Sequence, residues 1–156
     1  MSTLFLRAAG LAAFLLAPVA ALSAPVAPFD VAFGSPCEQI RQRLGNPPRQ
    51  PPPPGTISRF TQVFDVSEPE KFYPNAKAIE FGCVKGAFSN VAIKVDRHSP
   101  DDERLKRTLS ELSSKYGQAI VLRDSIADVQ LGDAILHVYV AADWFGLFYI
   151  RETESD

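Results

Sequence analysis

The sequence predicts an α+β domain, with a largely antiparallel sheet of about six or seven strands and two helices on one face. Three observations predict it. Two segments space their apolar residues as helices do, most of the others alternate apolar and polar residues as strands do, and short turns join neighbouring strands. After removal of a leader over residues 1–24, the remaining 132 of the 156 residues fit a single domain over residues 25–156.

Residues 1–24 are predicted to be a cleaved secretory signal peptide. Arg7 precedes a short apolar run, and small residues follow it in VAALSAP. The alternative is a membrane anchor, but Pro18 interrupts the run, which falls short of the ~20 residues that a spanning helix needs. We therefore expect a periplasmic or secreted protein with no membrane span after cleavage.

The first helix is predicted to begin at Ser35, which acts as the cap with Pro36 in the first helical position. Glu38 would complete a capping box with Ser35. Gly45 would end the helix. Cys37 and Ile40 fall on its apolar face.

The second helix is predicted to begin at Ser99 and to end at Gly117, with leucines and Tyr116 at helical spacing. Each helix opens with Ser-Pro, closes with glycine and follows a strand-like run, PFDVAF (28–33) or NVAIKVDRH (90–98). A twofold pseudo-repeat of strand, helix and strands is the simplest account. Chance similarity stays open as an alternative, because Ser-Pro is a common helix start.

The remaining segments alternate as strands, and Lys85-Gly86 and Asp143 indicate hairpin turns. In the segment from 133 to 141, the aliphatic residues should meet the helices, which leaves His137 and Tyr139 on the more open face. The predicted strands are SRFTQVFDV (58–66), NAKAIEFGCV (75–84), NVAIKV (90–95), QAIVLR (118–123), DAILHVYVA (133–141) and WFGLFYIRE (144–152).

Residues 46–55, NPPRQPPPPG, include six prolines and therefore form neither a helix nor an inner strand. One interpretation is a polyproline ligand for a partner. We favour a stiff connection between helix and sheet, because the usual readers of such motifs are intracellular signalling domains.

Cys37 and Cys83 are the two cysteines of the chain. Cys37 at a helix start fits a reactive thiol, whose pKa the helix dipole would lower. However, both cysteines lie on predicted apolar faces, and the signal peptide directs the chain to an oxidising compartment. We therefore predict a Cys37–Cys83 disulfide that pins the first helix to the sheet.

The stretch GSPCEQIRQRLGNP, residues 34–47, resembles the helix signature of small bacterial envelope modules, of the type of the beta-lactamase inhibitor protein and the small lipoprotein of the outer-membrane assembly machinery. The resemblance implies a binding or assembly module rather than an enzyme. The residues in register are Gly34, Gln39, Ile40, Leu44, Gly45 and Pro47.

Sites for chemistry are sparse. His98 with Asp96 and Asp101 could gather near one strand end, but such residues are more often solvated loop positions, and we expect no metal and no cofactor. The carboxylate pair Asp101–Asp102 lies at a helix start, and the pair Glu68/Glu70 lies in a loop. Neither is set in an apolar pattern that would raise a carboxyl pKa for acid–base catalysis. A formal net charge of −2 without a basic patch argues against a nucleic-acid partner.

Three functions follow as hypotheses. The first is an exported binding module, such as an inhibitor, immunity-like protein or envelope assembly factor, whose partner is another envelope or secreted protein. Its candidate interaction residues are Phe72, Tyr73 and Trp144, because loop and hairpin aromatics often anchor partners. The alternative is a periplasmic small-ligand carrier or enzyme, with a pocket around His137 and Tyr139 and a contribution from Asp133. A purely structural envelope subunit is a third hypothesis.

Overall fold

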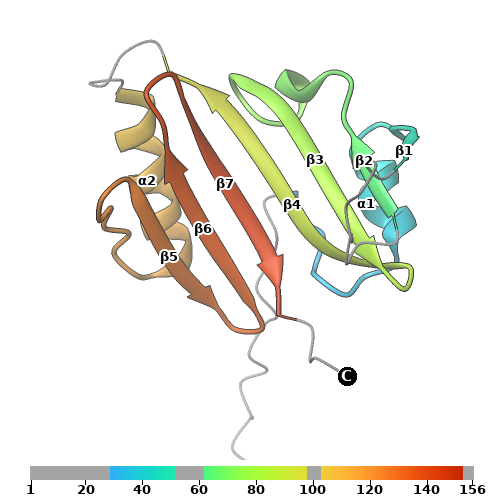
Figure 1. Ribbon diagram of the computed structural model, residues 1–156. Helices are drawn as coiled ribbons and strands as arrows, with labels where there is room; N and C mark the ends of the chain where they lie inside the picture. Colours follow the sequence, from blue (N-terminus) through green and yellow to red (C-terminus); the bar gives the residue numbers. More distant parts are fainter. Residues whose placement is uncertain (1–28, 52–61, 98–102, 153–156) are drawn as a thin grey trace, which may run out of the picture.

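The computed structural model describes residues 29–51, 62–97 and 103–152, and these form two α-helices and one antiparallel sheet of seven strands. The predicted fold class is confirmed. The sheet order is β1-β2-β3-β4-β7-β6-β5 (Figure 1). The elements are α1 (Cys37–Arg43), β1 (Arg49–Gln50), β2 (Gln62–Asp65), the 3-10 turn η1 (Pro69–Lys71), β3 (Ala76–Val84), β4 (Ala87–Asp96), α2 (Glu103–Tyr116), β5 (Ile126–Leu131), β6 (Ala134–Val140) and β7 (Trp144–Arg151).

Two meanders build the sheet. β2–β3–β4 follows α1 in the chain, β5–β6–β7 follows α2, and the last strands of the two meanders, β4 and β7, pair at the centre. Each half thus contains a helix followed by an antiparallel meander of three strands, and the first half adds the two-residue strand β1 between its helix and its meander. This arrangement matches the helix-and-strands part of the predicted repeat. The strand predicted over residues 28–33 is wrong for its described residues, which form turns around a single bridge position.

Both helices pack on the same face of the sheet. Cys37 of α1 is bonded to Cys83 of β3, and Val95 and Phe145 of the central strands line a pocket together with Thr108 of α2. Figure 1 shows α1 beside β2 and α2 beside β5 to β7. The core lies between this face and the helices, and its fully covered side chains include Phe81, Ile93, Leu136, Phe145 and Leu147.

The start of α1 differs from the prediction, whereas its end is confirmed. Pro36 occupies the cap position, and no side chain caps the helix. The backbone N–H of Cys37 donates instead to the carbonyl of Gly86 at 2.8 Å, because residues 35–37 run beside the start of β4. At the other end Gly45 has φ +81°, and the N–H of Asn46 donates back to Arg41, as in a Schellman motif.

One predicted strand was misplaced in the chain. Residues 118–123 are not a strand; they connect α2 to the sheet, with Val121 exposed and Ile120 buried. The strand is β5, where Ala127, Val129 and Leu131 alternate inward. The end of α2 at Tyr116 agrees with the predicted stop at Gly117, whereas the predicted cap, Ser99, lies outside the described residues.

The proline-rich connection contributes β1, a two-residue strand at the outer edge of the sheet that pairs with β2. Prolines at positions 48 and 51 flank it, in keeping with the restriction of proline to edges. Residues 52–61, which include the rest of the predicted rod, lie outside the described part of the chain. Across the part that is described, no helix is long and apolar enough to cross a membrane.

Candidate functional site: the open face of the sheet

The two cysteines form a structural bridge. Cys37 and Cys83 are disulfide-bonded across a sequence separation of 46, with their Cα atoms 6.0 Å apart. Both are buried, at 7% and 0% exposure. The prediction of a disulfide is therefore confirmed, and the alternative of a reactive thiol is excluded in this state.

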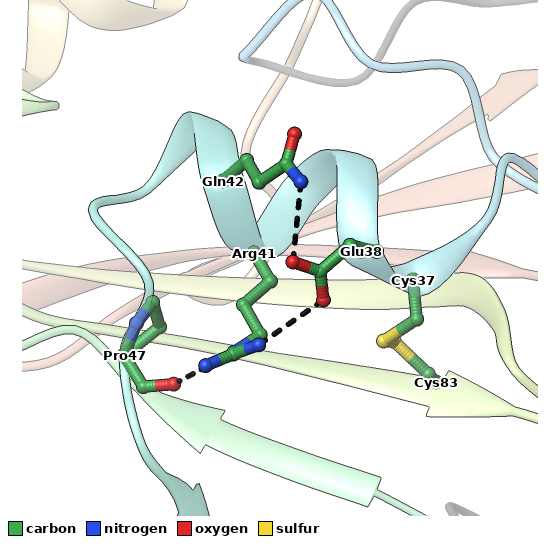
Figure 2. A network of polar contacts seen from close by, with 6 residues as sticks. All are labelled: Cys37, Glu38, Arg41, Gln42, Pro47 and Cys83. Carbon is green, nitrogen blue, oxygen red and sulfur yellow. Dashed lines mark hydrogen bonds and ion pairs between the residues drawn. A yellow bond between two sulfur atoms is a disulfide. The ribbon is translucent and has the colours of Figure 1, made fainter.

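A small polar network stiffens the helix beside the bridge (Figure 2). The Arg41 guanidinium donates to Glu38 at 3.1 Å and to the carbonyl of Pro47 at 3.3 Å. Gln42 donates to the other oxygen of Glu38 at 3.2 Å. Glu38 thus binds side chains one turn ahead instead of completing the predicted capping box, and the network ties α1 to the loop that leaves it.

Among the described residues no helix covers the opposite face of the sheet, and we call it the open face. Antiparallel register assigns its side chains, because cross-strand partners point to the same side. Rows of buried partners such as Phe81, Val91 and Tyr149 belong to the helix face, so the rows between them belong to the open face. The open-face rows over the central and outer strands are Lys94–Gly146–Tyr139–Ile126, Ala92–Phe148–His137–Asp128 and Asn90–Ile150–Ile135–Gln130, with Trp144 beside the first.

Aromatic side chains gather on this face around a glycine. The Tyr139 and Trp144 ring centroids are 5.4 Å apart, and Lys94 Nζ lies 4.5 Å from the Trp144 centroid. A Cβ on Gly146 would lie 2.5 Å from Cε2 of Phe148 and 3.0 Å from Cζ3 of Trp144. The missing side chain therefore lets both rings lean over β7 and form one surface.

This surface is apolar and reachable by solvent. Tyr139 is 42% exposed, Ile150 is 40% exposed and Ile126 is 47% exposed, while Trp144 and Phe148 are half-buried. Exposed large apolar side chains that are contiguous, rather than scattered, mark interaction sites. We call the set Ile126, Ile135, Tyr139, Trp144, Phe148 and Ile150 the aromatic patch.

The predicted pocket residues lie within the same face. His137 Nδ1 and the Asp128 carboxylate are 2.6 Å apart across β5 and β6, with side-chain exposures of 38% and 62%. Asp133 does not join them; it accepts a hydrogen bond from Arg151 at 2.9 Å beside the β5–β6 turn. The structure therefore brings His137, Tyr139 and Trp144 together, in an exposed setting.

Phe72 and Tyr73 lie elsewhere. They follow η1, are half-buried and pack against the core on the helix side. Burial raises the pKa of the Tyr73 hydroxyl, while a hydrogen bond with Thr108 of α2 acts in the opposite direction. These two residues do not share a surface with Trp144, so their proposed role as interaction residues stays a separate prediction.

One open-face feature was missed from the sequence. Asp65 of β2 and Glu80 of β3 are direct cross-strand partners, and both are exposed. Burial raises the pKa of Glu80, and the nearby Asp65 carboxylate raises it further. The only sequence signal was one acidic residue at an outward position in each of two predicted strands. The sequence does not reveal the register between these two strands, which places Asp65 opposite Glu80.

Glu80→Gln is expected to stabilise the protein at pH 7. A carboxyl whose pKa is raised in the folded state favours folding when protonated, and this contribution is lost as the pH rises through the folded pKa. The gain at pH 7 should be below about 1 kcal/mol, because the exposed carboxylate is screened by water. Urea unfolding at pH 7 and pH 3 checks this. A gain that is equal at both pH values would contradict the electrostatic cause.

Both edges of the sheet are protected. Ile126 of β5 exchanges backbone hydrogen bonds with Arg123 at 2.8 and 2.9 Å, and the Gln118 side chain donates to the carbonyl of Gln130 at 3.0 Å. At the opposite edge β1 is short and flanked by prolines. Short, covered or proline-bearing edges resist pairing with another strand. Neither edge of the described sheet is therefore a long, unprotected strand that favours addition of another strand.

No group of three His, Cys, Asp or Glu side chains in the described residues is placed to hold a metal ion, and His98 falls outside them. Comparisons with protein-family models, with curated proteins and with solved structures find no match for this chain. The resemblance of residues 34–47 to envelope modules therefore remains an expectation.

Proposed function

We propose that the protein is an exported binding module that engages another envelope or secreted protein through the open face of its sheet. The observation that carries this proposal is the aromatic patch, in which Tyr139, Trp144 and Phe148 form one solvent-facing surface around Gly146. Tyrosine and tryptophan anchors of this kind supply most of the energy at protein interfaces.

A catalytic use of the same face is less well supported. The His137–Asp128 pair lies on the two outermost strands of this end of the sheet, and both side chains are substantially exposed. Acid–base catalysis depends on a site that excludes water and holds a substrate against the base. A cross-strand polar pair within a solvent-facing binding surface agrees better with this exposure.

Export is supported by the disulfide and by the signal-like residues 1–24. Disulfides persist in oxidising compartments and are rare where thiols are kept reduced. The resemblance of the α1 region to small envelope modules supports the same compartment and a binding role.

The proposal is tested by affinity capture from the native envelope fraction with the mature protein and two variants. Ile150→Asp places a charge in the aromatic patch, whereas Val121→Asp places one at a 67%-exposed position outside it. We expect Ile150→Asp to reduce capture of the partner at least about tenfold, because an unpaired charge would be desolvated at the interface. An equal loss of partner capture with both variants would refute the open face as the interface. Unchanged capture with both variants would refute it as well.

A further inference from the structure

We infer that the partner presents a basic side chain, arginine or lysine, beside the apolar group that it packs on the aromatic patch, and that this basic group is received by Asp65 and Glu80. The inference rests on the proposed function, because it names the chemistry of the partner at the same face. The open face has an aromatic half over β6 and β7 and an acidic half over β2 and β3.

In the described part of the chain no basic side chain pairs with the acidic half. Asp65 and Glu80 are direct cross-strand neighbours, an arrangement that is destabilising for like charges. Within the described residues neither carboxylate makes an ion pair. Partial burial raises the pKa of Glu80, and the neighbouring Asp65 carboxylate raises it further.

The other described charges of this face are already engaged. Lys94 lies over the Trp144 ring, Asp96 pairs with Lys77 at 3.4 Å, and Asp128 pairs with His137. Asp65 and Glu80 are therefore two adjacent carboxylates of this face without an ion-pair partner among the described residues, and a positively charged group complements them.

The register places the two halves within reach of one partner segment. Asp65, Glu80, Ala92 and Phe148 follow one another in a single cross-strand row. Strands are about 4.8 Å apart, so Glu80 and Phe148 are separated by about 10 Å. The residue between them, Ala92, is small and half-buried, which leaves room for a long side chain to lie over it.

A lysine or arginine suits this span. Its methylene stem covers apolar surface while its charged head stays polar, so one side chain can lie over Ala92 and end at Glu80. An arginine can also pair with the carboxylates through several donors of its planar guanidinium. The neighbouring apolar group of the partner would then meet Phe148 and Trp144.

The test uses a phage-displayed random peptide library selected on the mature, oxidised protein and, in parallel, on Asp65→Lys/Glu80→Lys. We expect wild-type binders to combine an aromatic or large aliphatic residue with arginine or lysine. Binders of the charge-reversed protein should carry aspartate or glutamate instead. Wild-type selections without enrichment of basic residues would overturn the inference.

One wild-type-selected peptide is then measured against three purified variants. Asp65→Asn/Glu80→Gln should weaken it at least about tenfold, and Trp144→Ala should weaken it at least about thirtyfold. The matched control, Glu70→Gln/Asp124→Asn, removes two exposed charges outside the open face and should leave the affinity unchanged.

The two ideas fail in different ways. If Trp144→Ala weakened binding and the Asp65/Glu80 variant did not, the inference of a basic group on the partner would be refuted. The open face would still stand as the binding surface. Unchanged binding with Trp144→Ala would refute the face itself. Because removing the acidic pair is expected to stabilise the fold, misfolding does not explain a loss in that variant.

Discussion

Replacing Cys37 and Cys83 together by alanine is expected to lower the free energy of unfolding by about 4 kcal/mol. The bridge closes a separation of 46 residues, and the chain-entropy model assigns about this value to a loop of that size. For a domain of this length the loss corresponds to a fall in melting temperature of roughly 12–20 °C. Urea unfolding of the variant and of the wild type gives the difference.

The disulfide is expected to matter this much because α1 is short. The helix has seven residues, well below the length at which isolated helices are stable in water, so tertiary contacts must hold it. Ile40 and Leu44 supply buried packing, and the disulfide fixes the first turn to β3. Loss of the bridge should therefore loosen α1 before the sheet.

Reduction of the wild-type protein is the control, because it opens the same bond without changing the sequence. It should destabilise the protein by a similar amount, and amides of α1 should exchange faster than those of β4 and β7. A loss below about 1 kcal/mol in both experiments would contradict the role of the bridge as the main constraint on α1.

Trp144→Ala is expected to weaken partner binding by about 2 kcal/mol or more, which is roughly a thirtyfold loss of affinity. The indole contacts Tyr139 and receives Lys94 on its ring, so its removal opens the centre of the aromatic patch. Titration calorimetry with the captured partner measures the change.

Stability should change much less than binding in this variant, because Trp144 stands on the open face rather than in the core between sheet and helices. Phe72→Ala is the informative comparison, since Phe72 packs on the helix side. If Phe72→Ala weakened binding and Trp144→Ala did not, the interface would lie on the helix side of the sheet.

The fold could be predicted largely because local signals agreed with tertiary structure. Gly45 ends α1 in a left-handed conformation, and Lys85 and Gly86, both with positive φ, turn β3 into β4 as their sequence indicated. Alternation in β6 correctly separated the aliphatic side from His137 and Tyr139.

Other features depended on contacts that the sequence does not encode locally. Residues 118–123 have the composition of a strand, but their backbone is used to connect α2 to β5 and to cover an edge. The predicted side-chain cap at the N-terminus of α1 does not form, because residues 35–37 pair with the start of β4 instead. The Asp65–Glu80 pair requires the β2–β3 register, which no single segment reveals.

Site-specific photo-cross-linking tests the central claim most directly. p-Benzoylphenylalanine is placed at Tyr139, in the aromatic patch, and separately at Phe72 and at Val121, which lie outside it. Irradiation in the native envelope should yield the same cross-linked partner from the protein labelled at Tyr139 and none from the other two. A partner cross-linked through Phe72 or Val121 but not through Tyr139 would contradict binding through the open face.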